Sequence, residues 1–148
     1  MTRIAFQTEI RAACVTLLET YAATADIALQ AYPGRPMTLY PPTAFVDRID
    51  EEINYTNALR QRHPAAQVIA VWGQFDSKAA VEQRDAFVDA WLNAVTDDED
   101  AAGAVTLIEL NRVTDIPVFN PDWGPEQQQQ TSYYATRFFV EGLALEGD

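Results

Sequence analysis

The chain has 148 residues with 22 acidic and 10 basic side chains, and its formal net charge of −12 argues against a nucleic-acid-binding surface, which needs clustered lysine and arginine. This length fits one domain, 1–148, whose core needs no disulfide or metal. The single cysteine, Cys14, excludes an internal disulfide, and the lack of a long apolar run predicts a soluble protein without signal peptide or membrane span, made in a cytoplasm.

Residues 4–25 are predicted to form an amphipathic helix. Apolar side chains recur at helical spacing from Phe6 through Leu17 to Tyr21, and polar ones fall elsewhere. Cys14 lies within the apolar stripe. We expect a buried, unreactive thiol there, because a nucleophilic cysteine needs an exposed, electropositive setting.

Three strands are predicted next, arranged as an antiparallel meander. The first covers residues 27–32, and the proline-rich loop that follows it cannot pair inside a sheet. The second, residues 44–55, alternates with Phe45 and Ile49 on its apolar side. Asp47 and Glu51 interrupt that side, which predicts a bulge or a strand that leaves the core partway.

The third strand begins at Gln67 in this prediction. Residues 68–72 form a nearly continuous apolar run, typical of a central strand, and Gly73 ends it. The preceding residues, 57–64, contain a basic cluster of Arg60, Arg62 and His63. We interpret this cluster as a solvated hairpin connection, since His63 has no second histidine or cysteine nearby with which to bind a metal.

A second amphipathic helix follows, with Asp76 or Ser77 as its N-cap. Arg84 is the exception to its pattern, because helical spacing places it inside the apolar stripe. One interpretation is that the side-chain stem packs in the stripe while the guanidinium reaches a carboxylate or the domain edge. The other is a contact between subunits, where arginine is enriched. The predicted apolar stripe consists of Ala80, Phe87, Val88, Trp91, Leu92 and Val95.

The acidic run at residues 97–100 offers carboxylates to a divalent cation. Its spacing does not match a calcium-binding loop, and a continuous charge run is more typical of a solvated turn. We therefore predict no metal site there.

Two further strands are predicted at residues 105–113 and 132–143. The connection between them is too long for a compact domain unless it is functional or disordered. It carries Phe119 and Trp123, which favours a segment that orders on a partner. The alternative is that both rings fold back over the edge of the sheet.

The predicted fold class is α+β, with the order α-β-β-β-α-β-β. The first three strands and the last pair form one mixed, mostly antiparallel sheet of about five strands, and two helices pack on one face. No phosphate loop, nucleophile elbow, zinc-protease motif or cysteine pair occurs in the sequence. The sequence therefore predicts no enzyme and no cofactor.

Two segments resemble a known family. The proline-rich segment from Tyr32 to Ile49, and above all the segment from Val71 to Trp91 that reads V-W-G-Q-F-D-S-K-A-A-V-E-Q-R-D-A-F-V-D-A-W, are similar to tail terminator proteins of long, non-contractile tailed bacteriophages. The likeness of pattern covers most of the chain. The family offers no catalytic residues.

The resemblance implies a structural virion protein at the head-proximal end of the tail. Such proteins are small α+β subunits that form a hexameric ring on the tail tube, stop its polymerisation and contact the head-to-tail connector or stopper. DNA passes through the ring without specific binding, and an acidic chain suits that passage. The candidate partner-interface residues are Phe119, Trp123, Arg35, Tyr40 and Arg84.

Three other interpretations stay open at this point, and one of them is a non-viral interaction module. Another neck component, such as a head-to-tail stopper or connector subunit, would share the acidic, ring-forming, non-enzymatic character. A small ligand-binding domain or enzyme with an apolar pocket near Trp72, Phe75 and Trp91 is the alternative from a different class.

Overall fold

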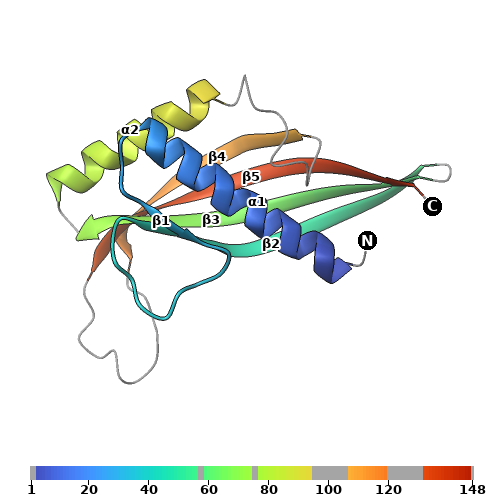
Figure 1. Cartoon of the computed structure of the whole chain (residues 1–148), viewed down its shortest axis with the longest axis horizontal. Helices are drawn as coiled ribbons and strands as arrows, with labels where there is room; N and C mark the ends of the chain where they lie inside the picture. The colour runs from blue at the N-terminus through green and yellow to red at the C-terminus, as the bar shows by residue number, and fades with distance from the viewer. Residues whose placement is uncertain (1–2, 57–58, 75–76, 95–106, 120–131, 148) are drawn as a thin grey trace.

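The computed structural model describes residues 3–56, 59–74, 77–94, 107–119 and 132–147 (Figure 1). The element order is the predicted one, α-β-β-β-α-β-β. In chain order the elements are α1 (Arg3–Thr24), β1 (Gln30–Tyr32), β2 (Thr43–Thr56), β3 (Leu59–Gln74), α2 (Lys78–Ala94), β4 (Leu107–Phe119) and β5 (Tyr133–Gly147).

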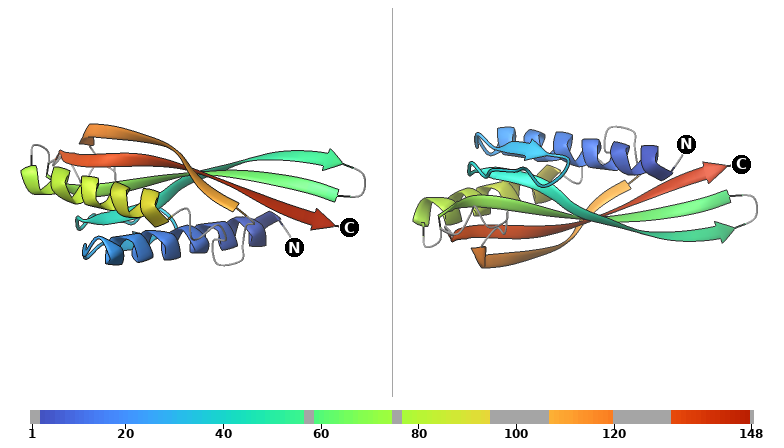
Figure 2. Two further views of the ribbon diagram at one scale, coloured as in Figure 1. Left: turned by 90° about the horizontal axis from the view of Figure 1, so that it is seen from above. Right: turned by 90° about the horizontal axis from the view of Figure 1, so that it is seen from below.

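The five strands form one mixed sheet in the order β1-β2-β3-β5-β4. β1 pairs with β2 in parallel, and the other neighbouring pairs are antiparallel. Both helices lie on one face of this sheet, as the views in Figures 1 and 2 show. The predicted α+β class is therefore confirmed.

The main core lies between the helices and the sheet, and aromatic rings form its centre. Trp91 of α2 stacks on Phe138 of β5 with ring centroids 5.2 Å apart, and Tyr21 of α1 lies 5.1 Å from Trp91. Phe87 lies 5.3 Å from Trp72 of β3. Such ring pairs add to the free energy gained by burying apolar area, so this cluster fixes both helices on the sheet.

A second, smaller core lies on the opposite face. Side chains alternate along a strand, so Val68 and Ala70 of β3 face the helices while Ile69 and Val71 face away. All four are fully buried. The sheet is therefore covered on both faces near its centre, as the continuous apolar run of β3 predicts.

Both helices have defined ends. At the C-terminus of α1, Asp26 has a φ of 59°, and the amide of Ile27 donates to the carbonyl of Ala22 at 2.8 Å, an arrangement that satisfies carbonyls left open by the helix. At the N-terminus of α2, the Ala80 amide donates to Ser77 Oγ at 3.3 Å. The predicted N-cap is therefore Ser77.

A bulge interrupts β2 at Asp47, between the pairs that Val46 and Arg48 make with β3. The predicted bulge is thus confirmed. The prediction that Phe45 and Ile49 share a side is wrong, because the extra residue reverses the alternation. Phe45 belongs to the second core, and Ile49 packs against the main one.

Two predictions about the first strands are wrong. The meander is not antiparallel throughout, because the loop after β1 carries the chain back to the start of that strand, so that Thr43 of β2 pairs with Gln30. β3 also begins at Leu59, eight residues before the predicted start at Gln67. The supposed hairpin connection is instead strand, in which Arg62 and His63 pair with Ile53 and Glu52 of β2.

β4 is longer than predicted, because it continues through Asp115 to Phe119. Pro117 has no amide donor, but β4 is an edge strand and the β4/β5 register shifts between Ile116 and Phe119. Edge strands and bulges tolerate proline for this reason. The long connection therefore begins after Phe119, which pairs with Tyr133 across the hairpin.

The predicted apolar face of α1 is confirmed in its described part, since Ile10, Leu17 and Tyr21 are buried. In α2, Leu92 differs from its predicted burial, because it is 54% exposed at the margin of the stripe. Neither helix, over the residues that the structure describes, is long and apolar enough to cross a membrane.

Candidate interaction surface

The loop between β1 and β2, residues 33–42, lies on the sheet face away from the helices, and we call it the strap. Leu39 anchors it, because this side chain is 7% exposed and packs in the second core with Phe45, Ile69 and Val71. Four of the ten strap residues are proline. Proline restricts the backbone and removes amide donors, so the strap does not extend the sheet.

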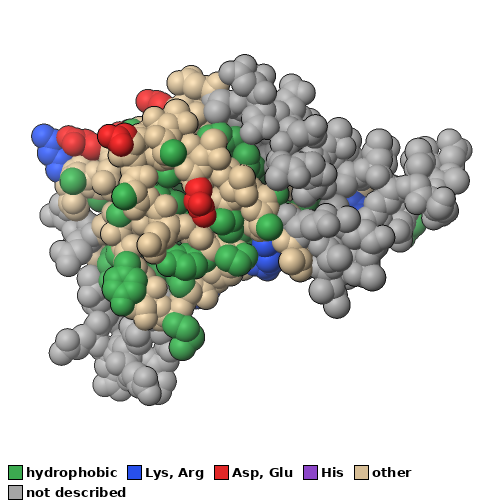
Figure 3. All heavy atoms as spheres, in the orientation of Figure 1, with side chains coloured by type: hydrophobic (Ala, Val, Ile, Leu, Met, Phe, Trp, Pro, Cys, Tyr) green, Lys and Arg blue, Asp and Glu red, His purple; other side chains and the backbone are tan. Residues whose placement is uncertain are grey.

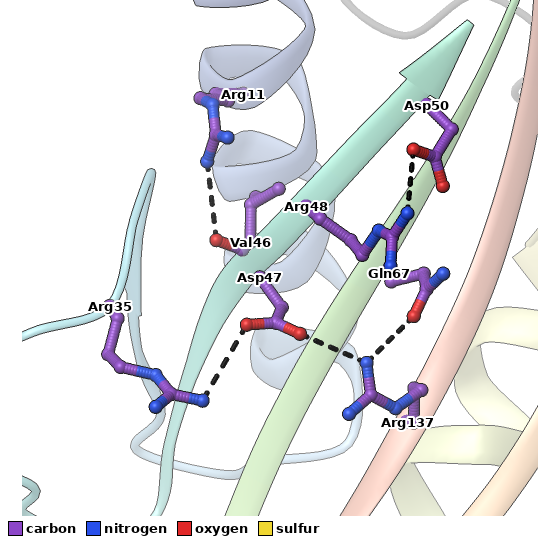
Figure 4. A network of polar contacts seen from close by, with 8 residues as sticks. All are labelled: Arg11, Arg35, Val46, Asp47, Arg48, Asp50, Gln67 and Arg137. Carbon is purple, nitrogen blue, oxygen red and sulfur yellow. Dashed lines mark hydrogen bonds and ion pairs between the residues drawn. The ribbon is translucent and has the colours of Figure 1, made fainter. Parts of the chain in front are cut away.

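A line of polar contacts joins the strap to the middle of the sheet (Figure 4). Arg35 Nη2 lies 3.6 Å from Asp47 Oδ1, and Arg137 Nη1 donates to Asp47 Oδ2 at 3.0 Å and to Gln67 Oε1 at 2.7 Å. The Arg35 guanidinium also lies 5.4 Å from the centre of the Phe45 ring. Partly exposed ion pairs contribute little stability each, but together these contacts fix the position of the strap.

Arg11 connects α1 to the same region. Its Nη1 donates to the carbonyl of Pro33 at 2.7 Å and to the carbonyl of Val46 at 3.3 Å. Pro33 begins the strap and Val46 precedes the bulge. One guanidinium therefore holds the first residue of the strap against β2 and satisfies two carbonyl groups.

The outer side of the strap is apolar. Met37 is 87% exposed and Tyr40 is 72% exposed, although Leu39 between them points into the second core. Apolar side chains are visible at the surface in this region, at the lower left of Figure 3. Tyr40 thus has the exposure that a partner contact needs, and Arg35, with 41% of its side chain exposed, lies on the same strap.

β2 and β3 continue past the N-terminal end of α1 as a long hairpin, which we call the arm (residues 50–56 and 59–65; Figures 1 and 2). The end of β5 runs alongside β3 in the arm. Ile53 is 41% exposed and Tyr55 is 74% exposed on its outer strand. The predicted departure of β2 from the core is therefore confirmed, and it creates a second exposed apolar surface.

The outer edge of the arm has no strand beside it in the described part of the chain. β1 covers only Thr43 to Phe45 of β2. An uncovered strand edge presents amide and carbonyl groups that can pair with another chain.

An acidic hollow of about 380 Å³ lies on the arm. Its lining includes the carboxylates of Asp50, Glu52 and Glu141. Asp50 accepts from Arg48 at 2.9 Å and Glu141 accepts from Asn111 at 3.1 Å, whereas Glu52 makes no ion pair within the described residues. No cluster of His, Cys, Asp and Glu in the described ranges could hold a metal ion.

A buried ion pair joins the two strands of the arm. Arg62 of β3 donates to Glu51 of β2, and the two side chains are only 5% and 2% exposed. The sequence pattern instead predicts a solvated connection at Arg62 and an interruption of the apolar side of β2 at Glu51. Burying either charge without the other would be unfavourable. Only the pairing of β2 with β3 brings the two charges together.

Arg84 links α2 to the edge strand β4. Its Nε donates to Asp115 Oδ1 at 3.0 Å and its Nη1 donates to Asp85 at 3.0 Å. Burial lowers the pKa of Arg84, but the hydrogen bonds to Asp85 and Asp115 and the Asp115 charge raise it overall. The predicted packing with a carboxylate partner is thus confirmed, and with 20% of its side chain exposed Arg84 offers little surface to another subunit.

The Asp115 carboxylate also takes part in a chain of hydrogen bonds that leads toward the main core. Thr136 Oγ1 donates to Asp115 Oδ1 at 3.1 Å and accepts from Trp72 Nε1 at 2.9 Å. Burial and the nearby Asp115 charge also raise the pKa of Tyr134. Asp115, which the sequence placed in a loop, therefore satisfies buried donors at the margin of the main core.

The other residues that the sequence singles out lie either outside the described residues or in the main core. Phe119 is the last residue of β4, but its side chain and the whole of Trp123 lie outside the described residues. The acidic run at 97–100 and Phe75 also lie outside them. The sequence also suggests an apolar ligand pocket near Trp72 and Trp91. These two side chains are 2% and 1% exposed and are packed in the main core.

Sequence reasoning missed Arg11 and Arg137 as contacts of the strap region. Arg137 alternates with the buried Phe138 on β5, which marks it as facing the other side of the sheet. That alternation could have indicated its face but not its partner Asp47, because the two are 90 residues apart in the chain.

No protein-family model matches this chain, and no curated protein sequence matches it.

Proposed function

We propose that this chain is the subunit of a ring that caps the tail tube of a long, non-contractile phage tail, stops tube polymerisation and joins the tail to the head-side connector. The resemblance of residues 32–49 and 71–91 to tail terminators supports this proposal. The α+β fold with the order α-β-β-β-α-β-β is also the one that the resemblance implies.

The observation that carries the proposal is the presence of two unlike apolar surfaces on the molecule. The strap exposes Met37 and Tyr40, and the arm exposes Ile53 and Tyr55. A closed ring of more than two subunits needs a heterologous interface, in which each copy presents one surface to one neighbour and a different surface to the other. A subunit with two separate, unlike apolar surfaces meets that requirement.

The negative charge of the chain is compatible with DNA passing through the ring. Each subunit carries a formal charge of −12, so a ring of six carries six times that charge. A surface of this sign repels phosphates and discourages DNA from adhering to the ring.

The experiment is a mass measurement by light scattering on the protein alone and mixed with the tail tube protein of the same phage genome. We expect a species of six 16.5 kDa subunits, or a smaller species that forms discrete caps on tubes and stops their growth. A ring of different stoichiometry that ignores the tube but binds portal or connector protein would replace the proposal with another neck component. A protein that remains monomeric with every partner would contradict any ring-forming role.

A further inference from the structure

We infer that the neighbouring copy in the ring is bound through its arm, so that the strap of one subunit receives the outer strand of the arm of the next. This inference rests on the proposed ring. It assigns the two exposed apolar surfaces to each other rather than to the tube or the connector.

The exposed apolar side chains of the described residues gather on two surfaces. Met37 and Tyr40 lie on the strap, and Ile53 and Tyr55 lie on the arm. The other large exposed apolar residues in the described ranges, Val81 and Leu92, are three helical turns apart on α2. Single exposed residues of that kind are common and need no partner, so the strap and the arm are the surfaces that remain to be covered.

The distribution of charge along the chain also favours this contact. Residues 27–46 contain one charged side chain, Arg35, and no carboxylate. Residues 47–55, which include the outer strand of the arm, contain four carboxylates and one arginine. In a chain with twice as many acidic as basic residues, a carboxylate-free segment is the part that another acidic copy can approach with least repulsion.

The strap and the arm are far apart within one molecule. Figures 1 and 2 place the arm at one end of the long axis and the strap in the opposite half of the molecule. Phe45 lies under the strap, and Tyr55 is ten residues further along the same strand, or roughly 33 Å at the rise of an extended strand. The two surfaces cannot meet within one chain, but head-to-tail contact between copies brings them together and covers the open edge of β2.

The test is cysteine crosslinking of the assembled protein. The variant Met37→Cys/Tyr55→Cys places one thiol on each surface, and both positions are exposed, so the fold is retained. A short bis-maleimide reagent is added to the assembly, with tube protein where the ring needs it. We expect a ladder of covalent species on a denaturing gel that ends at six subunits.

Matched controls identify the contact. Each single-cysteine variant should give no ladder, because linking more than two chains requires two thiols per chain. Met37→Cys/Leu92→Cys places the second thiol at an equally exposed apolar position on α2 and should also give no ladder. The native Cys14 does not interfere, since it is 2% exposed.

The fold of every variant is checked by its urea unfolding midpoint.

The outcomes separate the inference from the function. A six-subunit ring that crosslinks through Met37→Cys/Tyr55→Cys supports both. A ring that forms with that variant but gives no ladder overturns the strap-to-arm contact and leaves the capping role standing. A wild-type protein that forms no ring, alone or on tubes, overturns the proposed function and the inference with it.

Discussion

Cys14 shows how burial alone sets the reactivity of a residue. Its side chain is 2% exposed in the main core, and burial raises the pKa of the thiol to about 12, against a smaller lowering by the charge of Arg11. We expect the native protein to resist alkylation by iodoacetamide at about pH 8 and to react once it is unfolded in urea, because the thiolate is the reactive form. Mass spectrometry checks both states. Rapid labelling of the native protein would contradict the buried position.

The same thiol predicts a pH dependence of stability. The pKa is raised in the folded state above the ordinary value of 9.0, so the contribution of the protonated thiol is complete below about pH 9. It is lost as the pH rises toward about 12, because only the unfolded chain then releases the proton. We expect the stability difference between wild type and Cys14→Ala to shrink between about pH 8 and pH 10.5, measured by urea unfolding. A stability difference that stays constant over this pH range would contradict the raised pKa of Cys14.

Asp115 joins α2 and β5 to the edge strand β4 through its carboxylate. Its Oδ1 accepts from Arg84 and from Thr136, and Thr136 is fully buried. Asp115→Ala leaves that buried hydroxyl without its acceptor, and we expect it to lower the free energy of unfolding by about 1–3 kcal/mol. The measurement is urea denaturation. Asp85→Ala is the control and should change stability by less than about 0.5 kcal/mol, because it removes only an exposed contact.

At the scale of elements, the start of α2 depends on one side chain. Ser77 Oγ accepts from the amide of Ala80 at 3.3 Å and so satisfies one of the donors that the first helical turn leaves open. We expect Ser77→Ala to cost about 1 kcal/mol of unfolding free energy and Ser77→Asp to cost little, since Asp is an equally good cap. Chemical denaturation of the two variants tests this. Equal losses of unfolding free energy in Ser77→Ala and Ser77→Asp would show that the side-chain cap does not stabilise the helix.

Strand positions were less predictable than helix positions, for a reason visible in β2. A helix satisfies its own backbone hydrogen bonds, so the apolar spacing of residues 4–25 and the stripe of α2 predict both helices closely. A strand depends on its neighbours. The sequence indicated a bulge near Asp47, but which side of the sheet Phe45 faces depends on how β2 pairs with β3.

The same reason explains why β3 and β4 are longer than predicted. Arg62, His63 and Pro64 look like loop residues in isolation, as do Asp115 and Pro117. In the fold, Arg62 gains Glu51 as a buried partner and Asp115 gains Arg84. Contacts across the sheet offset the weak strand propensity of these residues.

At the scale of the whole molecule, the arm should matter for assembly and not for folding. We expect Ile53→Ser/Tyr55→Ser to unfold within about 0.5 kcal/mol of wild type, because both side chains are exposed. The same variant should lose the ring in light scattering, since it removes the apolar part of one surface. Val81→Ser is the matched control on α2 and should still assemble. A ring that survives the arm variant would show that assembly uses another surface.

Local patterns in the chain are enough to predict the elements that depend on local interactions. Apolar spacing predicted both helices, the central strand, the burial of Cys14 and the α+β order. The sequence also identified Arg35 and Tyr40 on the proline-rich segment, because proline excludes that segment from a sheet interior.

The contacts between residues far apart in the chain became visible only in the folded molecule. The parallel β1/β2 pair, the ion pair of Arg62 with Glu51 and the contact of Arg137 with Asp47 all join residues that no local pattern connects. The same holds for the separation of the strap from the arm, which follows from the length of β2 beyond the helices. Such contacts depend on strand pairing, and strand pairing is set by the packing of the whole sheet rather than by the residues of one strand.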